Sequence, residues 1–145
     1  MDYNKNTEEL LAEIKKDKDI ENYIKRNQEE FTVPLHEYLN NLLVEKNLSK
    51  KDVVSICGLE RSYAYHIFSG SSNPSREKIL ALAIAMNLNL EETQYLLRYA
   101  KMSPLYPRDP WDSVIISAIE QHLNVIQTDL LLGQVGETRL LGHQS

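Results

Sequence analysis

The sequence has little of the residues that mark several large classes of protein. Its single cysteine, Cys57, cannot form an internal disulfide, so we expect a reducing, cytoplasmic setting. No apolar run approaches the roughly 18 residues of a membrane-spanning helix and no secretory leader is evident, so we expect a soluble protein without a membrane partner. Basic residues number 16 against 21 acidic ones, and this net charge of −5 excludes a histone-like basic surface but not a local basic patch.

Metal-binding and catalytic motifs are also missing. The four histidines are scattered without the short spacing of a metal site, and no glycine-rich loop is present to cradle a phosphate. Adjacent acidic residues such as Glu8 and Glu9 are typical of a solvated helix surface rather than of paired-carboxylate catalysis. We therefore expect no enzyme activity, no cofactor and no metal.

Proline and glycine are scarce, with five of each, and the windows between them carry apolar residues at the three- and four-residue spacing of amphipathic helices. Helix-capping residues stand at the starts of four windows, at Ser49, Asn89, Asp109 and Asn124. The pattern predicts an all-α fold in a chain long enough for one domain with appendages. The helices are expected near residues 8–16, 20–29, 35–47, 50–57, 61–69, 76–87, 91–101, 110–122 and 125–133.

The most specific stretch is SKKDVVSICGLERSYAYHIFSG, from Ser49 to Gly70. It predicts two short helices around a tight turn, in which Gly58 takes a positive φ and Leu59 fills the space between the helices. One face of each helix is apolar and is expected to point inward, at Val53, Val54, Cys57, Ala64, Ile67 and Phe68. The opposite face of the second helix is polar.

This stretch resembles the helix-turn-helix of the phage-repressor-like (Cro/CI, XRE) DNA-binding family. The likeness continues through residues 73–75 into the next apolar helix, and it covers residues 35–101. Val54 departs from the family pattern, where a small residue is usual, and Phe68 replaces a common acidic residue. The resemblance implies a lambda-repressor-like five-helix domain that binds double-stranded DNA. It also implies a homodimer, because one helix-turn-helix reads only one half-site.

In the docking mode of that family, the second helix of the motif enters the major groove with its amino end first. Arg61 is then expected to contact guanine. The expected base-reading residues are Arg61, Ser62, Tyr65 and His66. The expected contacts to the DNA backbone are Lys50, Lys51, Ser69, Ser71 and Asn73. A continuous positive strip through Lys50, Lys51, Arg61 and Arg76 would favour DNA binding, and a broken strip would favour a helical adaptor that binds a protein partner.

Charge divides the chain into three predicted parts. Residues 1–34 hold two amphipathic helices up to Phe31 and carry a net charge of −3, residues 35–101 form the DNA-binding domain at +1, and residues 102–145 form a helical hairpin at −3. The short N-terminal helices must dock on the central domain or on another chain. The C-terminal hairpin is expected to extend the core or to form a dimerisation face.

The C-terminal hairpin also resembles the end of the central domain when the sequence is shifted by 35 residues. Residues 79–97 then align with residues 114–132. Identical residues of the first copy are Ala83, Ile84, Leu88, Asn89, Thr93, Leu96 and Leu97. The alignment indicates either a duplicated hairpin or a chance likeness between amphipathic helices.

Together these patterns predict a sequence-specific transcriptional regulator that acts by dimeric occupancy of an operator. The alternative is a helical adaptor or an antitoxin-like protein, which binds a protein partner through the N- or C-terminal helices and binds DNA weakly or not at all. The net charge of −5 is the main support for this alternative.

Overall fold

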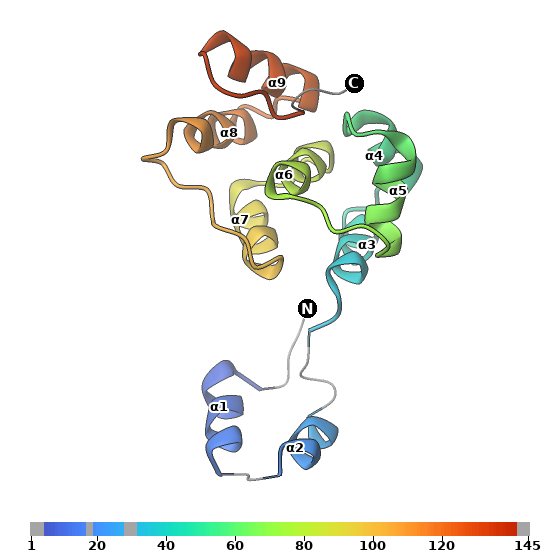
Figure 1. The fold of residues 1–145 in the computed structure, drawn as a ribbon, viewed down its shortest axis with the longest axis vertical. Coiled ribbons are helices and arrows are strands. Elements are labelled where there is room, and N and C mark those ends of the chain that lie inside the picture. The colour runs from blue at the N-terminus through green and yellow to red at the C-terminus, as the bar shows by residue number, and fades with distance from the viewer. Residues whose placement is uncertain (1–4, 17–18, 28–31, 142–145) are drawn as a thin grey trace. The chain divides into compact units, whose positions relative to one another are not determined.

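The computed structural model describes residues 5–16, 19–27 and 32–141, and within these ranges the chain is helical without a strand. The predicted all-α fold is confirmed. The helices in Figure 1 are α1 (Thr7–Lys16), α2 (Ile20–Arg26), α3 (Leu35–Glu45), α4 (Lys50–Ile56), α5 (Arg61–Ser69), α6 (Arg76–Ala85), α7 (Leu90–Tyr99), α8 (Pro110–Glu120) and α9 (Val125–Gln134). Every one of these helices is too short or too polar to span a bilayer. Residues 1–34 and 35–145 form two compact units.

The hydrophobic core of the larger unit is built around α6. Its residues from Ile79 to Ile84 are all buried, which is typical of a helix covered on every side. In Figure 1, α6 lies at the centre of this unit, between α3, α4 and α5 on one side and α7, α8 and α9 on the other. Ile115, Ile119 and Leu132 from the C-terminal hairpin belong to the same buried cluster. The hairpin therefore shares its core with the central helices.

Four helices end about two residues earlier than the periodicity predicts. Residues that were expected to be helical instead have a positive φ, between 54° and 62°, at Asn47, Asn87, Lys101 and His122. After each of them, the next amide bonds to a carbonyl five residues back, as the Leu88 amide does to the Ala83 carbonyl at 3.0 Å. This is the Schellman type of helix end. The predicted ends were wrong because apolar spacing does not report this left-handed position.

Helix starts follow the capping residues that the sequence indicates. Ser49 and Asp109 each accept a hydrogen bond from the backbone amide three residues later, and Pro110 occupies the first position of α8. The complete capping boxes are Asn89 with Glu92 and Asn124 with Gln127. Local hydrogen bonding therefore determines where these helices begin.

The 35-residue offset of the sequence also relates the two hairpins α6–α7 and α8–α9. Helices α7 and α9 begin and end 35 residues apart. Arg76 in α6 donates a hydrogen bond to the Ser103 carbonyl, and Trp111 in α8 donates one to the Thr138 carbonyl. Donor and acceptor are both shifted by 35 residues, so the likeness extends from sequence to tertiary contacts.

The N-terminal unit joins α1 to α2 through a buried amide. Asn27 is 2% exposed, accepts a hydrogen bond from Lys5 Nζ at 2.7 Å and donates one to Glu13 Oε2 at 2.8 Å. Exposed apolar side chains on the two helices are Leu11, Ile14, Ile20 and Ile24. Docking of these helices on another surface stays a prediction. The expectations for residues 28–29 and for Phe31 fall outside the described residues.

Candidate nucleic-acid interface

Helices α4 and α5 meet at the turn that the sequence predicts. Gly58 has a φ of 80°, and Leu59 is buried after it. The side chains expected to point inward are all buried, namely Val53, Val54, Cys57, Ala64, Ile67 and Phe68. Burial raises the pKa of the Cys57 thiol, which therefore stays protonated in the core. Throughout the described part of the chain, no three His, Cys, Asp or Glu residues are grouped to hold a metal ion.

The outward face of α5 holds the residues that we expect to read bases. Arg61, Ser62 and His66 are exposed, and Tyr65 is half-buried. The expected DNA-backbone contacts, Lys50, Lys51, Ser69, Ser71 and Asn73, are exposed as well. The fold thus leaves these side chains accessible to a ligand, and their roles stay predictions.

Aromatic rings of α5 lie close to three cations. The ammonium group of Lys50 is 5.6 Å from the centroid of the Phe68 ring. The Arg61 guanidinium lies 5.9 Å from the centroid of the Tyr65 ring, one helical turn away. Lys78, in the first turn of α6, has its ammonium group 5.1 Å from the centroid of the Tyr63 ring. We did not predict a role for Lys78 from the sequence, because its position beside α5 depends on how α6 packs. It adds a positive charge next to the expected interface.

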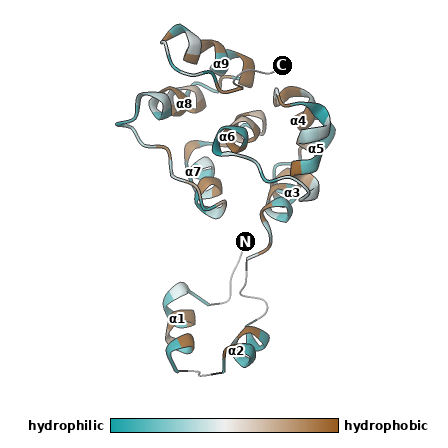
Figure 2. Cartoon of the chain, in the orientation of Figure 1, coloured by the Kyte–Doolittle hydropathy of each residue, from teal (hydrophilic) through white to brown (hydrophobic). Residues whose placement is uncertain are grey.

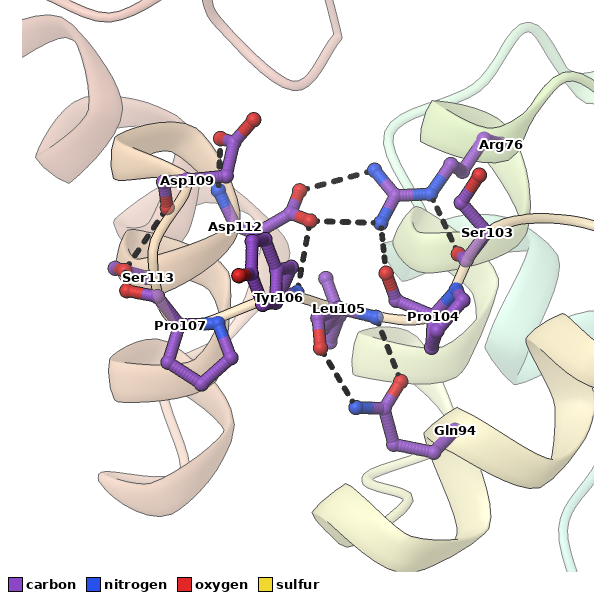
Figure 3. A network of polar contacts seen from close by, with 10 residues as sticks. All are labelled: Arg76, Gln94, Ser103, Pro104, Leu105, Tyr106, Pro107, Asp109, Asp112 and Ser113. Carbon is purple, nitrogen blue, oxygen red and sulfur yellow. Dashed lines mark hydrogen bonds and ion pairs between the residues drawn. The ribbon is translucent and has the colours of Figure 1, made fainter.

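Arg76 does not extend the positive strip that would favour DNA binding. Its guanidinium donates two hydrogen bonds to the carboxylate of Asp112, at 3.0 and 2.9 Å, and others to the carbonyls of Ser103 and Pro104 (Figure 3). The Asp112 side chain is only 8% exposed. Arg76 therefore fastens the connector between α7 and α8, and its charge is neutralised. The strip retains Lys50, Lys51 and Arg61, with Lys78 beside them.

Glu60 caps the amino end of α5, directly before Arg61. Its carboxylate accepts hydrogen bonds from the amides of Tyr63 at 2.8 Å and Ser62 at 3.0 Å. These two bonds hold the pKa of Glu60 below its ordinary value of 4.5. The carboxylate is therefore charged at neutral pH and already occupies amides that an incoming phosphate would use. These two amides are therefore not available to a phosphate at this end of α5.

Replacing Glu60 with glutamine is expected to destabilise the protein at neutral pH but to have little effect in acid. A carboxyl group whose pKa is lowered by folding stabilises the fold above its ordinary pKa, and this stabilisation is lost as the pH falls through the folded-state value. Thermal unfolding from about pH 7 to about pH 3 measures the difference, with the exposed Glu120→Gln as the control. A difference of equal size at every pH would show that the charge of the cap is unimportant.

The carboxyl end of α5 is held by α3. Gly70 ends α5 with a φ of 86°, and a Cβ atom at this position would lie 2.6 Å from Nδ1 of His36. Asn40 in α3 donates hydrogen bonds to the carbonyls of Phe68 at 2.8 Å and His36 at 2.7 Å. Only glycine fits this close approach, which fixes the end of α5 against α3.

The serines after α5 are part of a small hydrogen-bonded turn. The hydroxyl oxygens of Ser69 and Ser71 lie 3.0 Å apart, within hydrogen-bond distance of each other. Each hydroxyl also lies within hydrogen-bond distance of the His66 carbonyl, to which it can donate. Both serines are exposed. The turn therefore holds two hydroxyls on the side of α5 where we expect the DNA backbone.

The C-terminal hairpin lies against the turn of the motif, a contact that we did not predict. A Cβ atom on Gly58 would come within 2.8 Å of Leu141 Cδ1 and 3.2 Å of Val125 Cγ1. The amide of Leu141 donates to Asp129 Oδ1 at 3.1 Å, and Arg139 Nε donates to the other oxygen at 2.8 Å. The segment after α9 is therefore positioned against the turn between α4 and α5.

This arrangement of two short helices around a tight turn, with one buried and one polar face on α5, defines a helix-turn-helix domain. A comparison with protein families agrees, since residues 39–92 match a helix-turn-helix family. This match supports the resemblance to the phage-repressor-like (Cro/CI, XRE) helix-turn-helix family that the sequence predicted. Comparisons with curated proteins and with solved structures found no match.

Proposed function

We propose that the protein is a sequence-specific transcriptional regulator that acts by dimeric occupancy of an operator. Helix α5 of each copy enters the major groove, where Arg61 donates two hydrogen bonds to a guanine. Ser62, Tyr65 and His66 contact neighbouring base edges. Two copies read two half-sites about one helical turn apart and thereby block or recruit polymerase.

The polar outward face of α5 is the observation that carries this proposal. Arg61, Ser62 and His66 are exposed on a helix whose other face is buried in the core. Contacts from α3 and from the segment after α9 hold this motif in place, so its side chains are presented on a rigid support. Residues 35–101 carry a net charge of +1, whereas both flanking segments are at −3. This central domain is the part of the chain best suited to approach a polyanion.

Lys50→Ala is expected to weaken binding to all DNA sequences alike. Lys50 is exposed at the start of α4, where its ammonium group can neutralise a phosphate, so its loss should reduce the slope of log K against log salt by about one. Fluorescence anisotropy at several salt concentrations measures this slope for a selected duplex and for an unrelated one.

The matched control for Lys50 is Arg108→Ala, which removes a cation from the connector between α7 and α8. That connector lies on the opposite side of the larger unit from α5 (Figure 1). We expect the control to bind DNA like the original protein. If neither Lys50→Ala nor Arg61→Ala changes DNA binding, the major-groove proposal is wrong.

A helical adaptor or antitoxin-like protein is the second candidate function. Arg76 is neutralised by Asp112, and Glu60 places a negative charge at the amino end of α5. Both features reduce the attraction for DNA in a chain whose net charge is −5. A protein that retains no duplex DNA at near-physiological salt, but forms a defined complex with another protein through its terminal helices, would favour this candidate.

A further inference from the structure

Helix α9 has apolar side chains on a second face, outside the core. Val125, Thr128, Asp129 and Leu132 form its buried face. On the adjoining face, Ile126 is 66% exposed and Leu130 is 50% exposed. The remaining exposed residues of this outer face, Gln127, Gly133 and Gln134, are uncharged. Figure 2 shows brown, hydrophobic residues along much of this helix. The outer face of α9 is the name we use for its five exposed residues Ile126, Gln127, Leu130, Gly133 and Gln134.

Helix α7 provides an internal comparison, because it occupies the equivalent position in the other hairpin. At the 35-residue offset, Ile126 corresponds to Glu91 and Gly133 corresponds to Arg98, both of which are exposed and charged. The hairpin therefore does not need apolar or small residues at these positions in order to fold. Gln127 also corresponds to a charged residue, Glu92. Because the outer face of α9 has no charged residue where α7 has three, it is suited to contact another protein surface.

We infer that the outer face of α9 pairs with the same face of a second copy of this chain. A two-fold axis through Leu130 places two antiparallel helices together, with Ile126 of one copy opposite Gly133 of the other. The spacing fits, because Ile126 lies four residues before Leu130 and Gly133 lies three residues after it. A Cβ atom on Gly133 would be in ordinary van der Waals contact with Arg139, whose Cδ atom would lie 3.8 Å away, so the side chain of Arg139 borders the position that the opposing Ile126 approaches.

Charge also favours a second copy as the partner. Residues 102–145 carry a net charge of −3, so most pairings of this segment with itself would bring like charges together. The outer face of α9 avoids this repulsion because its five residues are uncharged. Arg139 borders the face, but its guanidinium is matched by Asp129 at 2.7 Å. Pairing here deepens the proposed function, because it names the surface that joins two DNA-reading units. The biological purpose of the pairing rests on the proposed function, but the pairing itself does not require DNA.

Sedimentation equilibrium of the full chain tests this pairing at micromolar and higher concentrations. We expect the original protein to dimerise and Leu130→Glu to raise the dissociation constant at least about a hundredfold, because two like charges would face each other at the axis. The matched control is Val44→Glu, which adds the same charge at an 80% exposed valine in α3 and should leave the dimer intact. A monomeric original protein, or a Leu130→Glu variant that dimerises normally, would overturn the inference.

Leu130→Cys provides a second test in case Leu130→Glu fails to fold. At a two-fold axis, an added oxidant removes two electrons and two protons from the paired thiols and forms a disulfide between the copies. Cys57 is fully buried and does not compete. We expect a cross-linked dimer from Leu130→Cys but none from Val44→Cys. If the original protein is dimeric and Leu130→Cys gives no cross-link, the surface is wrong.

Titration with DNA separates this inference from the proposed function. Leu130→Glu should bind a duplex with one half-site as tightly as the original protein and lose only the additional affinity for an inverted repeat. Dimerisation through α9 without any DNA binding would contradict the proposed function but support the pairing. DNA binding as a dimer that Leu130→Glu does not disturb would contradict the pairing alone.

Discussion

Asp112→Asn is expected to lower the free energy of unfolding by about 3 kcal/mol, because it leaves the guanidinium of Arg76 without its counter-charge in a largely buried site. The Asp112 side chain is 8% exposed and that of Arg76 is 22% exposed, so water can replace the lost interaction only in part. Asp112 also accepts a hydrogen bond from the Tyr106 amide at 3.0 Å. The substitution therefore weakens the connector and the attachment of the C-terminal hairpin together.

Urea unfolding of Asp112→Asn, Arg76→Ala and the double variant measures this effect. The double variant should lose less stability than the sum of the two single variants, because the second substitution removes a charge that the first left unpaired. Lys46→Ala is the control, since it breaks a more exposed pair with Glu92, whose side chains are 34% and 30% exposed, and should cost no more than about 1 kcal/mol. A loss for Asp112→Asn no greater than that of the control would show that the buried pair does not fasten the hairpin.

Arg61→Ala is expected to weaken binding to the preferred operator by about 1 to 3 kcal/mol, which is roughly fivefold to 150-fold, and to relax the preference at one base pair. Arg61 begins α5, is exposed, and is steadied by the ring of Tyr65. In the proposed docking mode this side chain donates two hydrogen bonds to one base, so we expect its removal to reduce affinity for the correct base but to have little effect on other sequences. The measurement is a titration against duplexes that carry each base in turn at the affected position.

Arg98→Ala is a close control for Arg61→Ala. Arg98 is an exposed arginine on α7, and its guanidinium lies 5.3 Å from the centroid of the Tyr95 ring. It thus shares the charge and the aromatic neighbour of Arg61 but lies outside the motif. We expect Arg98→Ala to leave both affinity and base preference unchanged. Equal losses for the two variants would indicate that net charge alone governs binding.

The helices could be predicted from the sequence because the signals are local. Apolar spacing identified each helix, and side chains such as Asn89 and Asn124 marked the starts through capping bonds within the same turn. The helix ends were less predictable. Lys101 and His122 take the left-handed conformation that glycine or asparagine usually takes, so residue type gave no warning.

The candidate interface was predictable only where it depends on the periodicity of α5. Arg61 and His66 fall on the exposed face because Ala64, Ile67 and Phe68 occupy the buried one. The neutralisation of Arg76 could not be foreseen, because its partner Asp112 lies 36 residues away and is brought near by tertiary packing. The packing of the C-terminal hairpin on the turn at Gly58 was missed for the same reason.

Capture of sheared genomic DNA by the full chain at near-physiological salt tests the central proposal most directly. The retained fragments are sequenced beside those retained by Arg61→Ala. We expect the original protein to enrich one inverted-repeat motif whose half-sites lie about one helical turn apart, and Arg61→Ala to lose that enrichment. Retained DNA with no enriched motif relative to Arg61→Ala would contradict sequence-specific operator binding.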